Sequence, residues 1–150
     1  MENTCNVRQV TIEDYIVIND WYKKRKEQQP KSSILPNNGL NGFVVEKNGN
    51  IVAVIYLYLT NSKMGYFDFL MSDPDYKEKD RYELIMKLFQ HCTKMAIGSG
   101  IECVFVTTAI PGVIDKMKEL GAREDLICED QKRIIIYTYQ DGNQVFLNKQ

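Results

Sequence analysis

The N-terminal part of the chain passes from a short apolar stretch to a helical rhythm and then to polar residues. Residues 6–10 fit a short strand, and Thr11 with an acid three residues later is a common helix start. Apolar positions then recur at helical spacing, which predicts a helix that continues to Gln29 and ends at Pro30. Residues 31–41 are rich in Ser, Pro, Asn and Gly, as loops are. The apolar face of the predicted helix comprises Tyr15, Ile18, Trp21 and Tyr22.

Three antiparallel strands are predicted in the middle of the chain. Residues 42–47 and 51–59 flank Asn48-Gly49, which is the strongest short signal for a β-hairpin. Residues 51–59 are β-branched, aromatic or apolar almost throughout, so we expect a central strand that is buried on both faces. After a polar turn, residues 66–71 form the third strand.

The second half of the chain alternates helices and strands. An apolar stripe predicts a long helix over residues 80–97, and Gly98 and Gly100 follow it as a stop. A strand over residues 101–106 comes after that helix, so it should lie parallel to the strand before it. The order predicts an α/β fold in a single domain, residues 1–150, with a mixed antiparallel and parallel sheet of six to seven strands flanked by helices. The remaining expected elements are a helix at 111–120, strands at 122–128 and 133–139, and a tail at 141–150.

The composition is that of a folded, soluble domain. Of the 150 residues, 44% are hydrophobic and 26% are charged, which argues against a disordered chain. Lys and Arg total 19 against 20 Asp and Glu, so no overall positive field would attract nucleic acid or an anionic membrane. No apolar run is long enough for a transmembrane helix, and residues 1–6 lack the apolar core of a signal peptide. A cytoplasmic location is therefore expected.

The cysteines do not form a metal-binding pattern. Cys5, Cys92, Cys103 and Cys128 lie far apart, no Cys-x-x-Cys pair occurs, and His91 is the only histidine. A structural zinc site would need ligands from distant places, so no metal is expected. We interpret the cysteines as small buried side chains in a reducing compartment.

The element order resembles that of the GNAT family, the acetyl-CoA-dependent N-acetyltransferases, over about residues 7–139. The resemblance rests on the Asn48-Gly49 hairpin, the strand-Pro74-helix junction and a Leu120-Gly121 helix ending. The chain looks most like small, divergent phage and bacterial members of the family. Their further features here are Trp21 on the first helix, Pro36 in the loop, and Leu57-Tyr58-Leu59-Thr60 at the end of the central strand.

The resemblance implies a fold with acetyl-CoA in a V-shaped split between the fourth and fifth strands. The pantetheine arm would pair with the fourth strand, and the pyrophosphate would lie at the start of the long helix, where N–H groups are free. The cofactor-binding residues that the resemblance implies on these elements are Leu70, Met71, Ser72, Tyr82 and Thr107.

The segment before the long helix departs from the family pattern. The family carries glycines there, so that phosphates can approach the backbone closely. Residues 75–83 contain none, and Glu78, Asp80 and Glu83 would repel an anion. The cationic side chains could compensate, or the segment could be an ordinary solvated helix start. The compensating candidates are Lys77, Lys79 and Arg81.

A second departure concerns the acid that would protonate the leaving thiolate. Family members often carry a Tyr on the last helix, three residues before its Leu-Gly ending, and Met117 stands there in this chain. Methionine cannot donate a proton. Thr107 or Thr108 corresponds to an Asn often found after the fifth strand, and the hydroxyl of Thr108 could assist.

Asp68 is the best candidate for the general base. It is the only acid in the predicted strand 66–71, and its aromatic neighbours point to the opposite face. Asp is rare in strands and costly to bury without a partner. The alternatives are that Asp68 pairs with a cation across the sheet or faces solvent. Glu46 is a weaker candidate because it ends an exposed hairpin strand.

Aromatic side chains are plentiful enough to line an acceptor groove. Residues of this kind more often belong to the core, with their hydroxyl groups reaching the surface. The candidate acceptor-binding residues are Trp21, Tyr22, Tyr56, Tyr58 and Tyr66.

Three functions follow in order of preference. The first is an enzyme that transfers an acetyl group from acetyl-CoA to an amine of a small molecule or a protein. The second is a catalytically degenerate protein of the same fold, phage-encoded or virion-associated, that acts by binding other proteins. The third, nucleic-acid binding, has only the basic run 23–26 in its favour. A homodimer is one option, because such domains often pair through sheet edges or terminal strands.

Overall fold

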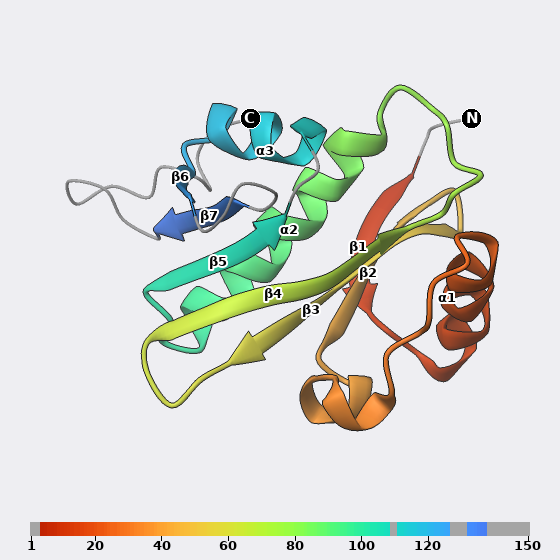
Figure 1. The fold of residues 1–150 in the computed structure, drawn as a ribbon, viewed down its shortest axis with the longest axis horizontal. Helices are drawn as coiled ribbons and strands as arrows, with labels where there is room; N and C mark the ends of the chain where they lie inside the picture. Colours follow the sequence, from red (N-terminus) through yellow and green to blue (C-terminus); the bar gives the residue numbers. More distant parts are fainter. Residues whose placement is uncertain (1–3, 109–110, 127–131, 138–150) are drawn as a thin grey trace.

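A computed structural model describes residues 4–108, 111–126 and 132–137, and their side chains over residues 4–106 and 112–122. The seven strands form one mixed sheet in the order β1-β2-β3-β4-β5-β7-β6 (Figure 1). Neighbouring strands are antiparallel except for β4 and β5, which are parallel, as the crossover through the long helix predicts. The strands are β1 (Cys5–Gln9), β2 (Gly42–Lys47), β3 (Asn50–Leu59), β4 (Met64–Ser72), β5 (Cys103–Thr108), β6 (Arg123–Leu126) and β7 (Lys132–Tyr137).

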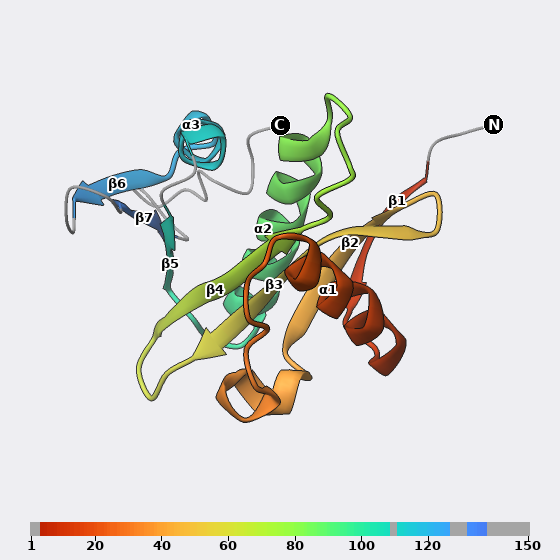
Figure 2. The ribbon, with the colours of Figure 1, turned by 45° about the vertical axis from the view of Figure 1, so that its right-hand side comes forward.

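Helices cover the two faces of the sheet and create two cores. Helix α1 (Ile12–Lys24) lies on one face, and α2 (Arg81–Gly98) and α3 (Pro111–Glu119) lie on the other (Figure 2). Side chains of β3 alternate between the cores: Val54 and Tyr56 pack toward α1, whereas Ile55 and Leu57 pack toward α2. The prediction that the central strand is buried on both faces is confirmed from Ile51 to Leu57.

Helix α1 ends at Lys24, so the prediction that it continues to Gln29 was wrong. Lys26 adopts a left-handed backbone conformation, with φ of 56°. The Lys26 N–H donates to the Lys23 carbonyl, and the Glu27 N–H donates to the Tyr22 carbonyl, as in a Schellman helix ending. No glycine marks this ending in the sequence, which is why the helical rhythm gave no warning of it.

Other boundaries differ less from the prediction. The expected loop contains two short 3-10 turns, η1 (Ser32–Ile34) and η2 (Pro36–Gly39). Cys92 and Cys103 are buried as expected, but Cys5 is exposed because it begins the edge strand β1. Cys128 and the expected tail lie outside the described residues.

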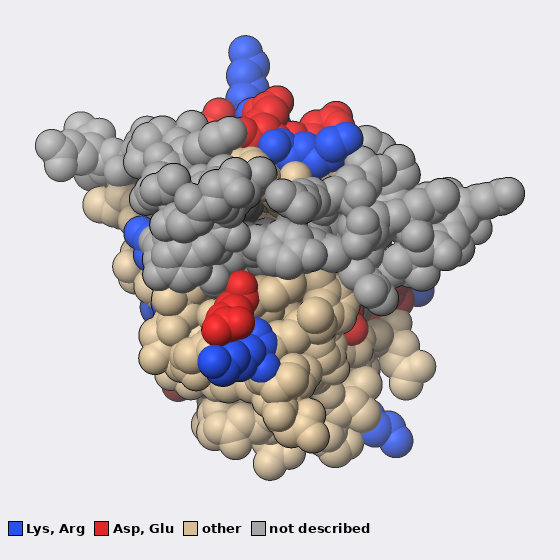
Figure 3. Space-filling model, turned by 90° about the vertical axis from the view of Figure 1, so that its left-hand side faces the viewer, with Lys and Arg blue, Asp and Glu red and all other residues tan. Residues whose placement is uncertain are grey.

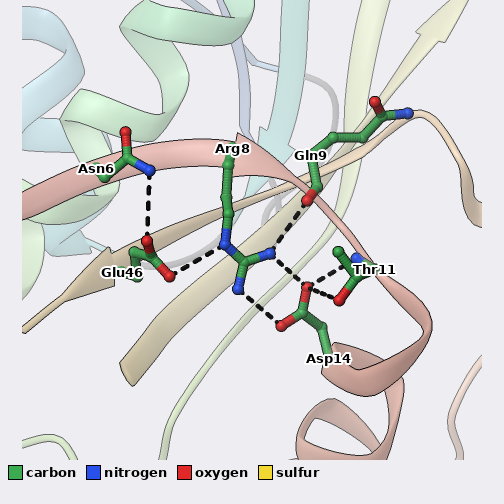
Figure 4. Close-up of polar contacts among 6 residues, drawn as sticks. All are labelled: Asn6, Arg8, Gln9, Thr11, Asp14 and Glu46. Atoms are coloured by element: carbon green, nitrogen blue, oxygen red, sulfur yellow. Dashed lines mark hydrogen bonds and ion pairs between the residues drawn. The ribbon is translucent and has the colours of Figure 1, made fainter. Parts of the chain in front are cut away.

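An ionic network fixes the start of α1 against the edge of the sheet (Figure 4). The Arg8 guanidinium donates to both oxygens of Asp14, at 2.7 and 3.0 Å, and its Nε donates to Glu46 on β2 at 3.0 Å. Thr11 closes the helix start by donating its backbone N–H to Asp14 Oδ2 at 2.7 Å. Burial alone would raise the pKa of Asp14, but the hydrogen bonds from Arg8 and Thr11 outweigh it and lower the pKa below its ordinary value. This stabilisation is present at neutral pH and is lost as the pH falls through the folded-state pKa.

We predict that Arg8→Met lowers the free energy of unfolding by about 3 kcal/mol, because it leaves the buried Asp14 carboxylate without its cation. The matched control is Lys63→Met, which removes an ion pair to Glu102 whose side chains are 72% and 67% exposed. We expect the control to change the free energy by less than about 0.5 kcal/mol. Urea unfolding measures both, and equal effects would show that the Arg8 network does not hold α1.

Candidate functional site

The pairing of β4 with β5 stops halfway along both strands. Met64 to Phe67 pair with Cys103 to Val106, and no pair follows. Beyond this point β4 continues to Ser72 beside β3, while β5 continues beside β7. Figure 2 shows the two strands diverging from their shared beginning. The backbone of β4 from Asp68 onward therefore has no strand neighbour on the β5 side, which is the predicted split.

A β-bulge lies in β4 directly after the last pair with β5. Val54 of β3 pairs with Met71, but Tyr56 pairs with Asp68, so β4 carries one extra residue over this interval. Phe69, inside the bulge, has a left-handed φ of 57°. That conformation is unusual for a bulky residue, and strained backbone of this kind tends to occur at ligand sites.

A cavity of about 150 Å3 lies beyond the bulge, where the end of β4 meets the start of α2. A water molecule occupies about 30 Å3 of liquid, so the cavity has room for a phosphate-sized group. The lining residues come from β4, α2, α3 and the segment after α1: Leu70, Met71, Ser72, Arg81, Tyr82, Ile85, Val113, Arg25 and Glu27.

Two arginine side chains meet on Ser72 in this cavity. Arg81 donates to Ser72 Oγ at 2.7 Å, and Arg25 donates to the Ser72 carbonyl oxygen at 3.2 Å. The Nε atoms of Arg25 and Arg81 are buried and have no hydrogen-bond partner among the described residues. A buried guanidinium N–H without an acceptor is costly. Both guanidinium groups line the cavity, and neither forms an ion pair with a carboxylate among the described side chains, so these residues fit a phosphate group.

The acidic residues near the start of α2, which were expected to repel an anion, do not line this cavity. Asp80, the residue before α2, is held by Lys47 at 2.5 Å and by the Tyr76 hydroxyl at 2.5 Å. These two partners lower the pKa of Asp80 below its ordinary value. Glu83 lines a separate cavity between α2 and α3, and Glu78 lines the cavity beside the β2–β3 hairpin. Of the cavity's lining residues, Glu27 alone is acidic.

The sequence-predicted cations divide into two groups. Arg81 lines the cavity, whereas Lys77 and Lys79 are exposed and are not among its lining residues. Arg25 is a lining residue that sequence reasoning missed, because it belongs to a basic run that was interpreted as the solvated end of a helix. The early end of α1 turns Arg25 toward Ser72. The only sequence signal for it was an arginine among lysines.

Asp68 lies on the α1 face of β4, where the pairing with β5 has just ended. It is exposed, and its Oδ1 accepts a hydrogen bond from the Phe69 N–H at 2.7 Å. No cation lies within ion-pair distance of Asp68 in the part of the chain whose side chains are described. Of the interpretations left open by the sequence, pairing with a described cation is excluded, and the carboxylate faces solvent.

The candidate aromatic residues separate by depth. Trp21 and Tyr56 are each 2% exposed and belong to the core under α1, so neither offers its ring to an acceptor. Tyr22 is also buried, and burial together with Glu27 and Asp68 raises its pKa to about 12. Tyr58 and Tyr66 are only partly buried and lie near Asp68. Burial, followed by Asp68 and Tyr66, raises the pKa of Tyr58 to about 12.

The position of the last helix at which family members often carry a tyrosine holds no proton donor in this chain. Met117 is 0% exposed and belongs to the core between α2, α3 and the sheet. Tyr82, from α2, instead packs its ring against Gly112 at the start of α3. Thr107 and Thr108 end β5 beside the split, and their side chains lie outside the described ones.

Other site types have less support. The largest cavity described, about 670 Å3, lies beside the β2–β3 hairpin and is lined by five acids against Arg8 and Lys47, which does not suit a phosphate. The described residues contain no group of three or more metal-binding side chains in position to hold an ion. No helix in the described ranges is long and apolar enough to cross a membrane.

Comparison with protein-family models and with curated protein sequences finds no match. Solved structures, however, share the fold. N-acetylglutamate synthase from Neisseria gonorrhoeae, in complex with coenzyme A and N-acetyl-glutamate, matches with a TM-score of 0.71 and 18% identity. The match covers 93% of this chain but 36% of the synthase, so the chain spans about a third of that protein.

Two further matches cover most of both chains. Ribosomal-protein-S18-alanine N-acetyltransferase from Escherichia coli has a TM-score of 0.66 at 14% identity, over 88% of this chain and 91% of the enzyme. A variant of spermidine N-acetyltransferase from Vibrio cholerae has a TM-score of 0.66 at 15% identity, over 91% and 96%. The chain therefore has the fold of the GNAT N-acetyltransferases, as the element order implied.

We predict that Gly112→Ala lowers the free energy of unfolding by about 1–3 kcal/mol through overpacking. A Cβ atom at Gly112 would lie 2.5 Å from Tyr82 Cζ, so the ring would have to leave its place between α2 and α3. The matched control is Gly98→Ala at the end of α2, where a Cβ meets nothing within 4 Å. We expect this control to stabilise the protein by up to about 1 kcal/mol.

Urea unfolding in the Tyr82→Ala background tests the same contact from the other side. There Gly112→Ala should have little effect, because the ring that it clashes with is gone. If Gly112→Ala leaves the free energy of unfolding unchanged in the wild-type background, the Tyr82 ring does not pack against Gly112.

Proposed function

We propose that the chain is an acetyl-CoA-dependent N-acetyltransferase. The observation that carries the proposal is that the unpaired half of β4 leads to a cavity in which two arginine side chains meet on Ser72. The shared fold supports it, because matching structures include the N. gonorrhoeae synthase with coenzyme A and a Salmonella typhimurium putative acetyltransferase with acetyl-CoA.

The backbone of β4 and the side chains of two arginines would bind different parts of the cofactor. Leu70, Met71 and Ser72 offer the free edge of β4, to which the amide groups of a pantetheine arm can bond as a strand would. Arg25 and Arg81 offer guanidinium donors to the pyrophosphate, beside Tyr82 at the start of α2. Lys77 and Lys79 would act from outside the cavity on the remaining phosphate charge, and Thr107 borders the split from β5.

Asp68 is the proposed general base. Bound acetyl-CoA supplies an acetyl thioester, so that the amine nitrogen gains a C–N bond and the C–S bond breaks after the ammonium has given up a proton. Asp68 takes this proton, directly or through water, at the place where β4 leaves β5. We propose that the Thr108 hydroxyl assists the departure of the CoA thiolate. The pKa of the thiol, about 8.5, lets the thiolate leave without a dedicated acid.

A second candidate function is a protein-binding role without catalysis. It is favoured by one observation, the fully buried Met117 where a proton donor is expected. The two functions differ in what they require of Asp68, since only the enzyme needs its carboxylate.

We predict that CoA binds with a micromolar Kd, and that Arg25→Glu and Arg81→Glu each raise this Kd at least tenfold. The reason is that a hydrogen bond to a charged group contributes about 1.5–3 kcal/mol. Lys94→Glu on α2 makes the same change of charge at an exposed position away from the cavity and should change Kd less than twofold. Lys79→Glu should fall between these values.

Isothermal titration calorimetry measures the five Kd values, those of the wild type and the four variants, with thermal unfolding as a check on folding. If Arg25→Glu and Lys94→Glu weaken binding equally, the phosphate group does not lie at Ser72. If CoA produces no heat at millimolar concentration, the proposed function is wrong.

We predict that Asp68→Asn lowers kcat at least tenfold and leaves the Kd of CoA unchanged, because general base catalysis contributes about 100-fold or more. The matched control is Asp20→Asn, an exposed carboxylate on α1, which should leave both values unchanged. Release of the CoA thiol is the readout. Unchanged turnover in Asp68→Asn would remove this residue from the mechanism and would favour the binding role.

A further inference from the structure

Three aromatic rings form a continuous strip next to Asp68, on the face of the sheet that carries α1. The rings of Tyr58 on β3 and Tyr66 on β4 stack with centroids 4.6 Å apart and planes 4° apart. Tyr66 stacks in turn on Phe105 of β5 at 5.4 Å and 22°. All three side chains are partly exposed, but Tyr58 and Phe105 cover the two faces of the Tyr66 ring, so the strip presents ring edges at the surface.

The surroundings of this strip are apolar and carry few charges. The Tyr58 hydroxyl donates to the Ile34 carbonyl oxygen at 2.9 Å, which fixes the 3-10 turn η1 at the edge of the strip. The side chains of Ile34 and Leu40 are 55% and 52% exposed. Figure 3 views the molecule from the end that holds the β3–β4 turn, and the described surface there is mostly uncharged.

Among the described side chains, Asp68 is the charged group next to the strip at the end where the split opens. Asp68 lies two residues after Tyr66 on the same face of β4, and its charge contributes to the raised pKa of Tyr58. Two residues of a strand span about 6.8 Å. A flat group at the edge of Tyr66 could therefore be joined to an ammonium at Asp68 by a link of about two carbon atoms.

We propose that the acceptor is an aralkylamine, a primary amine joined to an aromatic ring by a short chain. This inference rests on the proposed function and identifies the class of its substrate. The ring of the acceptor lies across the exposed edges of the Tyr58–Tyr66–Phe105 strip, because edge-to-face contacts between aromatic rings are favourable. The ammonium pairs with Asp68, to which it loses one proton, directly or through water, before the neutral amine attacks the thioester. The proton that the nitrogen loses on forming the amide goes to the departing thiolate.

The same charges argue against other acceptors. An amino acid acceptor such as glutamate would bring carboxylates to a site where no described cation pairs with Asp68. A polyamine would need further carboxylates along its length, but the strip beyond Asp68 offers rings and apolar side chains.

The experiment compares kcat/KM for 2-phenylethylamine, ethylamine, spermidine and glutamate at saturating acetyl-CoA, with CoA thiol release as the readout. We expect 2-phenylethylamine to exceed each of the other three about tenfold or more, since one aromatic pair supports this ratio. In Tyr66→Ala the ratio of 2-phenylethylamine to ethylamine should fall to about two, because 2-phenylethylamine loses a ring contact that ethylamine does not make. The control Met95→Ala, an exposed apolar side chain on α2, should leave the ratio intact.

Other outcomes separate the inference from the proposed function. CoA binding with spermidine or glutamate as the better acceptor overturns the inference alone. Equal losses for both amines in Tyr66→Ala also overturn it, because the ring would then have only a structural role. Where turnover is too slow to measure, the Kd of 2-phenylethylamine for the CoA-bound protein must be at least tenfold below that of ethylamine. No binding of CoA overturns the proposed function and the inference together.

Discussion

The parallel pairing of β4 and β5 stops at Phe67 and Val106, and the whole candidate site depends on this stop. Both strands are paired on their outer sides, β4 with β3 and β5 with β7. Closing the gap would therefore break the hydrogen bonds of one of these pairs. The bulge at Phe69 adds local twist where β4 turns away. A free strand edge ordinarily risks aggregation, but this one lies inside the sheet, where an extended ligand can pair with it.

Helix α1 places a positively charged side chain, Arg25, beside this strand edge. Its first turn is fixed by Arg8 and Asp14 at one end of the sheet, and its last turn closes through Lys26 in the left-handed conformation. With both ends of the helix set, Arg25 reaches Ser72 beside Arg81. In the proposed function, the two guanidinium groups take over the role that glycines have in the family pattern, because they provide long-range donors in place of close backbone contact.

Periodicity and turn chemistry were sufficient to predict the order of the elements, the buried strand β3 and the parallel crossover, because these features are local. Arg81 was a candidate because the resemblance implies a phosphate site at the start of the long helix, and Asp68 was a candidate because an acid is rare in an aromatic strand. Arg25 was missed because its place depends on a helix ending that no glycine announces. The burial of Trp21 and Tyr56 could not be predicted either, because the choice among several aromatic residues depends on which face α1 covers.

Strand β4 carries the proposed reaction in order along its length. Ser72, at its end, accepts hydrogen bonds from the two arginines. Asp68, before the bulge, has no cation within ion-pair distance among the described side chains, and Tyr66 carries the central ring of the aromatic strip. The bulge lies between the cationic part and the anionic part, and its extra residue changes which face the following side chains occupy. Leu70 packs toward α2 and Met71 toward α1 for this reason. The same irregularity that ends regular pairing therefore separates the end of β4 that suits phosphate from the face that suits an amine.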